Sequence, residues 1–172
     1  MPSFIDQILF RIGGNRLRIV LARKWGVKIG KNCVINPPCT FRKPYLVSIG
    51  DDCVITSGVS FLTSDGAIRI FKKSGDFKET VYGPIIIRDN CFIGLNSIIL
   101  LNVVVGPNSI IGAGSVVTKD IPPNTVYAGN PAKFICTYDE YLKKSKLRST
   151  GEIALKKRKK KLKEMFKNVL NG

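Results

Sequence analysis

Ser64 and Asp65 place a hydroxyl group next to a carboxylate in the stretch SFLTSDGA, residues 60–67. A serine hydroxyl is a poor base near neutral pH, and it becomes a nucleophile only with help from an adjacent base. Histidine is best suited to that task at cellular pH, and the chain contains none. Asp65 is the nearest carboxylate, but with an ordinary pKa of about 4 it is a weak base unless burial raises that pKa. The pair is therefore a candidate catalytic site without an evident base.

The five cysteines suggest a second chemistry, metal binding, which their spacing does not favour. They form no C-x-x-C pair, and without histidine they lack the usual mixed-ligand partners for zinc. We therefore predict structural thiols in a reducing compartment and no metal site. The residues are Cys33, Cys39, Cys53, Cys91 and Cys136.

A period of six residues organises the centre of the chain. Large aliphatic residues open successive blocks such as IGKNCV (29–34), IGDDCV (49–54) and IGAGSV (111–116). This period fits neither a helix nor a simple alternating strand, so each block is predicted to be a short extended segment followed by a turn, with three blocks in one triangular coil. The first position of each block is predicted to point inward, and so is the small fifth position. The first positions are Ile29, Ile35, Ile49, Ile55, Ile87, Ile93, Ile99, Val105 and Ile111; the fifth include Cys33, Cys39, Cys53, Cys91, Ser97, Ser109 and Ser115.

Glycine and Asn or Asp recur near the expected corners. Glycine often follows the aliphatic residue, and Asn or Asp is frequent two positions further on. Both types tolerate a positive φ, so we expect both to provide the backbone conformation of a tight corner. The glycines are Gly30, Gly50, Gly94, Gly106 and Gly112.

Two breaks in the period predict departures from the regular coil. Two extra residues between Phe41 and Ile49 predict a bulge or adjusted turn. Between Phe61 and Ile87 there are about twenty residues more than one block needs, and they predict a protruding loop at about residues 63–84. Long ordered loops often carry function, so this loop is a candidate part of the site.

The flanking segments have helical patterns. Residues 4–25 are predicted to form one or two amphipathic helices around Gly13 and Gly14, and residues 138–146 and 152–169 also have helical patterns. Net charge is +16, and residues 143–172 contribute +10 of it. In residues 156–170 the basic residues alternate with apolar residues spaced by three and four, which suits a surface helix or an anionic membrane. Nucleic-acid binding is not favoured, because no recognition helix, zinc module or aromatic RNA platform is evident.

The run IGAGSVVTKDIPPNTVYAGNPAK (111–133) resembles the closing coil of the hexapeptide-repeat acetyltransferases. With SFLTSDGA and FIGLNSIIL (92–100), it is most similar to the sugar and polysaccharide O-acetyltransferase branch, which is related to the galactoside and xenobiotic acetyltransferases. This resemblance implies an all-β solenoid, a left-handed parallel β-helix over residues 27–133. An N-terminal helical segment (1–26) would precede it, and a basic helical tail (134–172) would follow. It also implies a homotrimer that binds acetyl-CoA between neighbouring subunits.

The resemblance further implies which residues meet the ligands. Small residues along 112–115 would let the extended pantetheine arm of acetyl-CoA approach the backbone like an added strand. Asn96 and Tyr82 are the expected acceptor-binding residues, and Tyr82 and Trp25 are suited to stack on a sugar ring, although corner and core roles are open for each. The expected cofactor-binding residues are Gly112, Ala113, Gly114, Ser115, Thr118, Lys119, Ala132 and Lys133.

Ser64 stands where the polysaccharide O-acetyltransferases have their catalytic histidine, and Asp65 stands where they have the carboxylate that orients it. The galactoside group instead has a histidine at the place of Asn96. Three interpretations remain open for Ser64. It is an introduced substitution in an otherwise active enzyme, or it marks a natural relative with weakened or altered chemistry. The third is an active enzyme that uses Asp65, a loop residue or the substrate itself as base.

The expected function is thus acetyl-CoA-dependent O-acetylation of a sugar or of a lipid-linked or polymeric glycan precursor. N-acetylation of an amino sugar is an alternative, and so is an inactive trimeric binding or scaffold protein. No run of about 18–20 apolar residues is present, and the N-terminus lacks a secretory signal pattern. The expected location is the cytoplasm, with residues 156–170 as a membrane-surface contact.

Overall fold

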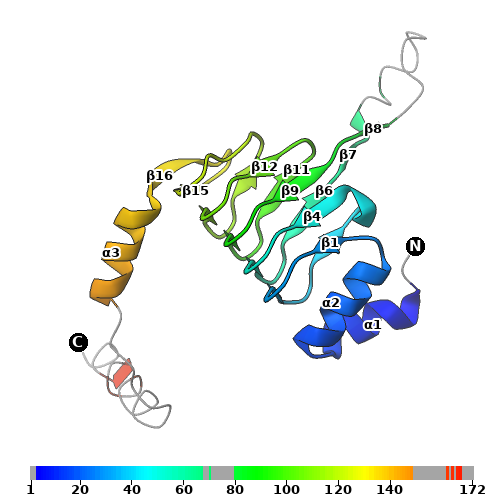
Figure 1. Cartoon of the computed structure of the whole chain (residues 1–172), viewed down its shortest axis with the longest axis horizontal. Coiled ribbons are helices and arrows are strands. Elements are labelled where there is room, and N and C mark those ends of the chain that lie inside the picture. The colour runs from blue at the N-terminus through cyan, green and yellow to red at the C-terminus, as the bar shows by residue number, and fades with distance from the viewer. Residues whose placement is uncertain are drawn as a thin grey trace. The chain divides into compact units, whose positions relative to one another are not determined.

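A computed structural model describes residues 3–67, 70, 80–148, 162, 164, 166 and 167 of the chain. Two compact units are present, Met1–Asp139 and Glu140–Gly172. The first unit consists of two helices followed by a stack of short strands (Figure 1). In the described part of the second unit, the helix α3 (Tyr138–Arg148) continues from the end of the first. The predicted helix at 152–169 lies almost entirely outside the described residues.

The strands follow one another in coils of three. The first coil contains β1 (Lys28–Ile29), β2 (Val34–Ile35) and β3 (Thr40–Phe41); the second contains β4 (Val47–Ile49), β5 (Val54–Ile55) and β6 (Ser60–Leu62). The third contains β9 (Ile85–Ile87), β10 (Phe92–Ile93) and β11 (Ile98–Leu100); the fourth contains β12 (Val104–Val105), β13 (Ile110–Ile111) and β14 (Val116–Val117). β15 (Thr125–Ala128) and β16 (Lys133–Thr137) close the stack.

Equivalent strands of successive coils pair in parallel and build three sheets. Sheet A has the order β1-β4-β9-β12, sheet B the order β16-β15-β13-β10-β5-β2, and sheet C the order β14-β11-β6-β3. The period of six therefore forms a three-sided parallel β-solenoid, as the sequence predicted. Each sheet draws one short strand from each coil, which is why no strand of the first four coils exceeds three residues.

The register of the sheets locates both predicted breaks. Phe92 pairs with Ile110, eighteen residues on, which is the regular coil of three blocks. Lys28 pairs with Ser48, twenty residues on, because the 3-10 turn η1 (Pro44–Leu46) takes up the two extra residues. Val54 pairs with Phe92, thirty-eight residues on, so the additional twenty residues leave the coil as the predicted loop.

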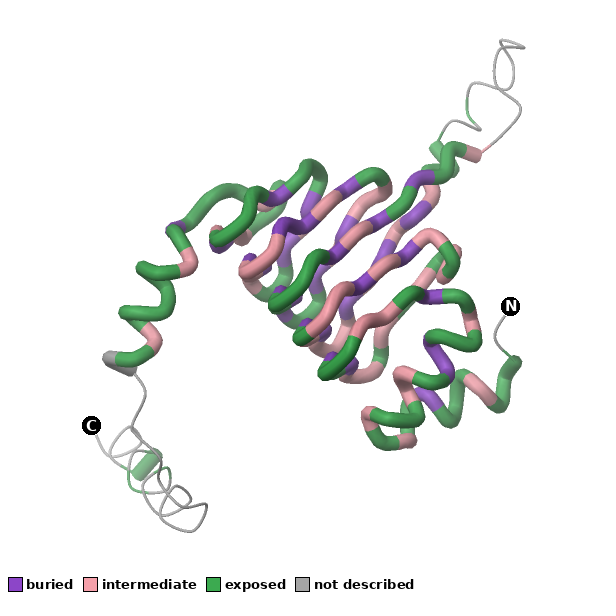
Figure 2. Tube along the Cα trace, viewed as in Figure 1, coloured by how far each residue is buried: buried purple, intermediate pink, exposed green. Residues whose placement is uncertain are grey.

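The interior is filled by the predicted inward positions (Figure 2). The first-position aliphatics from Ile35 to Ile111 are at most 2% exposed, whereas Ile29 in the first coil is only half-buried. The small fifth positions Cys53, Ser97, Ser109 and Ser115 are fully buried. Phe61 is also fully buried, and its ring stacks on that of Phe41 with a centroid distance of 5.1 Å.

The corners differ from the expectation about glycine. Asn32, Asp52, Asn90, Asn96, Asn102, Asn108 and Asn124 have positive φ, but the five predicted glycines do not. Those glycines are required for close packing between coils. At Gly94, for example, an added Cβ would lie 2.5 Å from the backbone nitrogen of Ala113, and at Gly30 it would lie 2.6 Å from the carbonyl carbon of Gly50. Thus Asn and Asp turn the chain, and glycine lets the next coil approach.

The buried cysteines behave as core thiols. None of the five is in a disulfide. Burial raises the pKa of Cys33, and burial raises the pKa of Cys39 to about 12. The Cys39 thiol donates a hydrogen bond to the Asn36 carbonyl at 3.0 Å. This bond requires the protonated thiol.

We predict that Cys39 reacts with Ellman's reagent or maleimide roughly 10³-fold more slowly in the native chain than in the urea-unfolded chain at the same pH. The reason is that only the thiolate reacts, and its population falls tenfold for each unit by which the pKa rises. Peptide mapping by mass spectrometry would give the rate at each cysteine. Equal rates in the native and unfolded chains would contradict the prediction.

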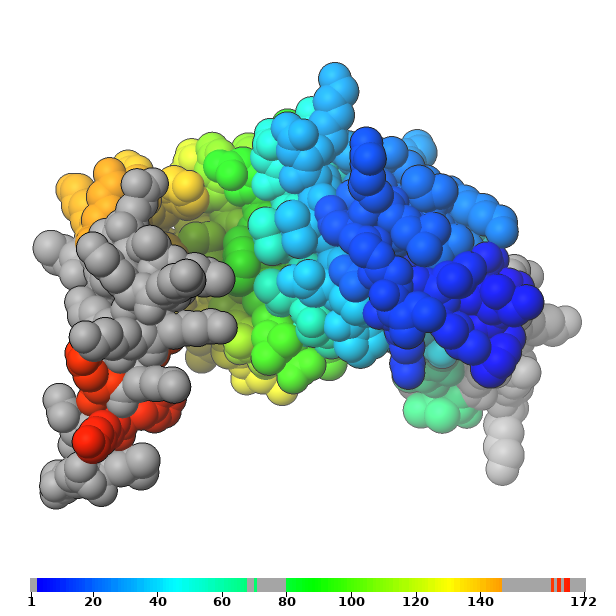
Figure 3. Space-filling view, turned by 90° about the horizontal axis from the view of Figure 1, so that it is seen from below, coloured from blue at the N-terminus to red at the C-terminus, as the bar shows by residue number. Residues whose placement is uncertain are grey.

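The N-terminal helices cover the first coil. α1 (Phe4–Ile12) packs on α2 (Asn15–Lys24), and the two form the dark blue end of the unit in Figure 3. The side-chain amide of Asn15 accepts from the Ile35 backbone N–H and donates to the Cys33 carbonyl, both at 2.8 Å. Arg18 donates to the Ile35 carbonyl at 3.3 Å, and Arg23 donates to the Ile29 carbonyl at 2.9 Å. Side chains of α2 therefore satisfy backbone groups of the first coil that no further coil pairs.

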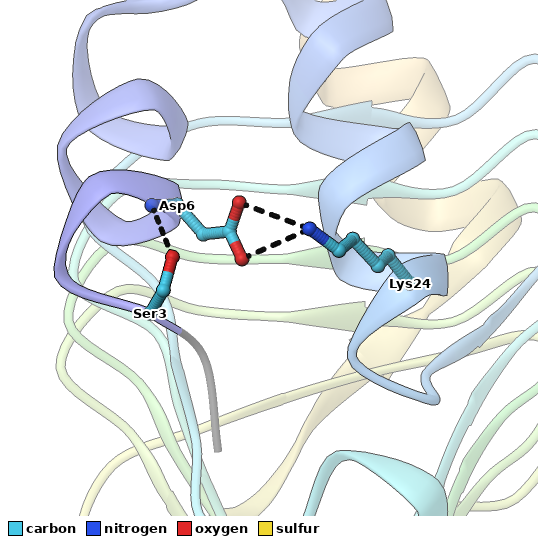
Figure 4. A network of polar contacts seen from close by, with 3 residues as sticks. All are labelled: Ser3, Asp6 and Lys24. Carbon is cyan, nitrogen blue, oxygen red and sulfur yellow. Dashed lines mark hydrogen bonds and ion pairs between the residues drawn. The ribbon is translucent and has the colours of Figure 1, made fainter.

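A polar network fixes the start of α1. The Ser3 hydroxyl accepts from the Asp6 backbone N–H at 3.1 Å, and Lys24 of α2 forms an ion pair with Asp6 at 3.2 Å (Figure 4). Desolvation alone would raise the pKa of Asp6, but hydrogen bonds from Lys24 and Ser3 lower it below its ordinary value. The contacts tie the first turn of α1 to the last turn of α2.

The opposite end is closed by β16, which the sequence did not predict. Residues 133–137 turn back and pair antiparallel with β15, with Val126 opposite Cys136. The solenoid sheet therefore extends to Thr137, four residues beyond the predicted boundary at 133. Cys136 belongs to this strand, and it is 7% exposed.

Candidate active site

The Ser64 segment forms the base of the protruding loop. β7 (Ser64–Asp65) pairs antiparallel with β8 (Val81–Tyr82), and Ser64 is directly opposite Tyr82. Ser64 is half-buried, whereas Tyr82 is 51% exposed. The structure thus brings together two predicted site residues that are eighteen positions apart in the chain. Residues 68, 69 and 71–79 of the predicted loop lie outside the described residues.

Thr63 and Lys43 position this pair, and the sequence analysis missed both. Thr63 is fully buried; its hydroxyl accepts from the Lys43 backbone N–H at 3.1 Å, and its carbonyl accepts from the Gly83 N–H at 3.0 Å. The Lys43 ammonium lies 5.5 Å from the centroid of the Tyr82 ring, within cation–π range. One signal was available for Thr63, because it continues the inward alternation of Val59 and Phe61.

The chemistry at Ser64 lacks a base in the described structure. The Asp65 carboxylate is exposed and accepts from the Ala67 backbone N–H at 2.8 Å, so it stabilises the local turn. Among the described residues, no side chain forms a hydrogen bond with the Ser64 hydroxyl. In the described part of the chain, Ser64 is thus not hydrogen-bonded to a side chain that could act as its base.

A second cluster lies at the corner between sheets B and C. The Asn96 backbone N–H donates to the Ser57 carbonyl at 3.0 Å, and the Gly114 N–H donates to the Leu95 carbonyl at 2.7 Å. Asn96 is exposed with φ of 55°, so its role as a corner residue is visible. Gly114 has φ of 68°, and a Cβ there would meet nothing within 4 Å, so this corner is open to solvent.

The predicted cofactor-binding residues group around this corner and along β14. The Val116 N–H donates to the Gly129 carbonyl at 2.9 Å, and the Ala132 N–H donates to the Val116 carbonyl at 2.8 Å. These bonds hold residues 129–133 alongside β14. Gly112 is in contact with Ala128, since a Cβ at Gly112 would lie 2.7 Å from the Ala128 Cβ. Ala113, Thr118, Lys119 and Lys133 are exposed.

Ser115 occupies the inward fifth position that the period of six predicted, so its side chain does not lie at the predicted cofactor surface. It is fully buried, its hydroxyl donates to the Gly112 carbonyl at 2.6 Å, and it accepts from the Gly129 N–H at 3.1 Å. A buried and satisfied side chain has no surface to offer to a cofactor. Ser115 instead fastens the Gly112 corner to the Gly129 turn.

Within one chain the Ser64 arm, formed by β7 and β8, is separate from the glycine corner, formed by Asn96 and residues 112–114. Ser64 follows the carboxyl end of β6, whereas Asn96 and Gly114 precede the amino ends of β11 and β14. The two groups therefore lie at opposite ends of the strands of sheet C. Thr118 and Lys119 follow the carboxyl end of β14, at the same end as Ser64 but two strands away, which corresponds to about 10 Å of sheet. Within one chain these two groups of predicted site residues therefore do not meet.

Two further properties hold for the part of the chain that the structure describes. It contains no cluster of three or more cysteine or acidic side chains placed to hold a metal ion. No helix in it combines the length and the apolar character that crossing a bilayer would need.

Comparison with known proteins identifies the class of fold. Residues 47–62 and 84–119 match the family model described as the hexapeptide repeat of succinyl-transferase. Galactoside acetyltransferase in complex with coenzyme A is similar with a TM-score of 0.63 and 28% identity, over 81% of this chain and 80% of that chain. The polySia-specific acetyltransferase NeuO is similar with a TM-score of 0.56 and 37% identity, over 65% of this chain and 52% of that chain. The solenoid is therefore a hexapeptide-repeat fold.

Sequence similarity identifies the family. Over 122 residues the chain is 45% identical to the protein CapG of Staphylococcus aureus, which covers 69% of this chain and 70% of CapG. The chain belongs to the hexapeptide-repeat acetyltransferase family, whose members are acyltransferases. It spans only 52% to 58% of the length of several other curated relatives.

Proposed function

We propose that the chain is an acetyl-CoA-dependent O-acetyltransferase that acts on a sugar or a glycan precursor. The observation that carries this proposal is the open corner at Gly114, with the exposed Thr118 and Lys119 at the other end of β14 and Lys133 next to the segment that runs alongside that strand. An extended pantetheine arm needs such a backbone to approach closely, and the lysines suit the phosphates of the cofactor. Galactoside acetyltransferase, which is similar over most of the chain, was solved with coenzyme A bound.

A homotrimer would complete the site. In this proposal the solenoid has the left-handed twist of its family, and the Ser64 arm of one subunit faces the glycine corner of the next. Asn96 and Tyr82 then contact the acceptor, while Gly112, Ala113 and Gly114 contact acetyl-CoA. Sedimentation velocity would show a species of three times the 19.0 kDa chain mass, and a monomer at micromolar concentration would contradict this arrangement.

Ser64 in place of a histidine is proposed to make turnover slow. Loss of a general base costs about 10²–10⁴ in rate, while positioning of the reactants and electrostatic stabilisation survive. The test is release of free coenzyme A from acetyl-CoA with a panel of neutral, amino and phosphorylated sugars, with products identified by mass spectrometry. Acceptor-dependent release supports the proposal, and N-acetylated products would favour the amino-sugar alternative. No release above hydrolysis with any acceptor would favour the binding or scaffold protein.

We predict that Lys119→Ala and Lys133→Ala each weaken coenzyme A binding by about 10- to 100-fold. A hydrogen bond to a charged group contributes about 1.5–3 kcal/mol, which corresponds to this range. Isothermal titration calorimetry would measure the dissociation constants, with the exposed Lys28→Ala as a control at the other end of the solenoid. Dephospho-coenzyme A would show which lysine contacts the 3′-phosphate, and unchanged affinity in both variants would refute the proposed cofactor site.

Residues 156–170 are proposed to contact an anionic membrane surface. Most of this segment lies outside the described residues, but Leu162 and Phe166, four positions apart, are 45% and 66% exposed. Basic residues near such apolar side chains suit anionic lipid. The full chain should co-sediment with phosphatidylserine vesicles in low salt, and the chain without residues 150–172 should not. Equal sedimentation of both would remove the membrane role of the tail.

A further inference from the structure

A cavity of about 460 Å³ lies between α1 and β3, away from the glycine corner. Its lining includes Arg11 of α1, Trp25 at the end of α2, and Phe41 and Arg42 at the end of β3. None of its lining residues is acidic. The cavity opens at the edge of sheet C, because β3 is the last strand of that sheet.

Three side-chain donor groups at this cavity have no partner among the described residues. The Trp25 indole Nε1 is buried without a hydrogen-bond partner, the sole buried side-chain nitrogen or oxygen among the described residues of which this is true. The guanidinium groups of Arg11 and Arg42 have no hydrogen bond or ion pair with any described residue. By contrast, Arg18 and Arg23 nearby donate to backbone carbonyls. Orphaned buried donors are rare in folded proteins and call for an explanation.

Aromatic rings form the apolar part of the wall. The Trp25 ring lies 5.1 Å from that of Phe10, and the Phe41 ring stacks on the buried Phe61 at 5.1 Å with an interplanar angle of 4°. These contacts hold Trp25 and Phe41 in place while each remains half-buried. Rigid aromatic walls with a few convergent donors are typical of a small-molecule site.

Backbone hydrogen bonds connect the residues at the cavity to the segment that carries Ser64. The Arg42 N–H donates to the Phe61 carbonyl at 3.3 Å, and the next residue, Lys43, donates to the Thr63 hydroxyl. Thr63 directly precedes Ser64, and Lys43 also lies over the ring of Tyr82. β3 and β6 are neighbouring parallel strands. Arg42, which follows β3, and Ser64, which follows β6, therefore lie at the same carboxyl end of these two strands.

From this placement we propose that the cavity binds the phosphate or diphosphate group of a phosphorylated sugar, with the sugar directed toward Ser64. Arg11 and Arg42 bind the phosphoryl oxygens, since guanidinium groups match phosphate in a bidentate geometry. The ring of Phe41 packs on the apolar face of the ligand. The inference rests on the proposed function for the identity of the sugar as acceptor, and it narrows that acceptor to an anionic one.

The test uses Trp25 as the probe, because it is the only tryptophan in the chain. The full chain is titrated with glucose, glucose 1-phosphate, uridine diphosphate glucose and a short-chain prenyl diphosphate glucose, and the tryptophan fluorescence is recorded. We expect a saturable change with the three phosphorylated probes and none with glucose. The relative affinities of the last two probes distinguish a nucleotide-linked from a lipid-linked sugar.

Substitutions identify the binding groups. Arg11→Gln and Arg42→Gln should each raise the dissociation constant about tenfold, as expected for the loss of one charge-assisted hydrogen bond. Arg88→Gln, at an exposed arginine of the solenoid, is the matched control and should leave the dissociation constant unchanged. Circular dichroism verifies the fold of each variant, and calorimetry measures the dissociation constants without relying on fluorescence.

The inference is overturned if no phosphorylated probe gives a saturable signal, or if Arg88→Gln weakens binding as much as the two cavity variants. This experiment involves neither acetyl-CoA nor turnover. If the phosphorylated probes bind but the coenzyme A release assay shows no acetyl transfer, the proposed transferase is refuted and the phosphosugar site is retained. Acetylation of neutral sugars without binding of the phosphorylated probes would refute only the site.

Discussion

Ser64→His is expected to raise the rate of acetyl transfer to the acceptor by about 10²–10⁴, the contribution typical of a general base. The physical reason is local. β7 and β8 hold position 64 opposite Tyr82, and the buried Thr63 fixes the backbone beside it. An imidazole at this position would take the hydroxyl proton as the acceptor oxygen attacks the thioester. The gained rate should increase with pH through about 6.5, because the base must be neutral to accept a proton.

Two control variants distinguish general-base catalysis by the introduced histidine from an effect of its side-chain size. Ser64→Ala should retain the slow rate of the parent chain, since the serine provides no base. Asp65→Asn in the Ser64→His background should lose part of the gain, because the carboxylate would no longer orient the imidazole. Steady-state release of coenzyme A at several pH values measures each variant. If Ser64→His gains no rate with any acceptor that the parent chain binds, the interpretation of position 64 as a vacated base site fails.

Phe61→Ala is expected to destabilise the chain by about 3–5 kcal/mol, the usual cost of a buried Phe→Ala change. Phe61 is fully buried in β6 between the first and third coils, and it loses its stacking on Phe41 when truncated. The neighbouring coils cannot close on the space, because their spacing is set by the backbone hydrogen bonds of the sheets. The measurement is urea unfolding followed by circular dichroism.

Phe4→Ala is the control for this prediction, since Phe4 is 77% exposed in α1. It should change the free energy of unfolding by less than about 0.5 kcal/mol, as surface substitutions usually do. A loss of similar size in both variants would mean that the inward position of Phe61 does not determine stability.

The coil itself could be predicted from the sequence because a six-residue period has few structural solutions. Ile93 and Ile111 recur at matched positions, and the register pairs them directly. The extra residues at both breaks could be counted for the same reason. The sequence could not predict β16, because a strand that returns antiparallel does not repeat the pattern of the parallel coils.

The different roles of glycine and of Asn or Asp at the corners also could not be predicted from the sequence. Glycine has two physical uses, a positive φ and the absence of a Cβ, and the sequence does not distinguish them. At Gly50 the second use applies, because an added Cβ would lie 2.8 Å from the Asp89 backbone nitrogen, while Asp52 provides the positive φ.

The candidate site was predictable as a set of residues but not as an arrangement. Motif resemblance pointed to Ser64 and to the glycine corner separately, and the fold places them at opposite ends of the strands of sheet C. For Ser115 the period of six predicted an inward side chain and the motif a cofactor contact, and its complete burial agrees with the first. Trp25 was named from the sequence as a sugar-stacking candidate, but Arg42 could be found only from the cavity between α1 and β3, and Lys43 only from its place over the Tyr82 ring.

The two closed ends of the solenoid restrict how copies of the chain can assemble. A parallel solenoid presents open strand edges at both ends, and such edges are templates for endless linear growth. Here the amide of Asn15 occupies the hydrogen-bonding groups of Cys33 and Ile35 at one end, and the reversed strand β16 pairs with β15 at the other. Neither end of sheet B therefore presents the parallel strand pattern that a further coil would continue, which disfavours end-to-end stacking of copies along the axis.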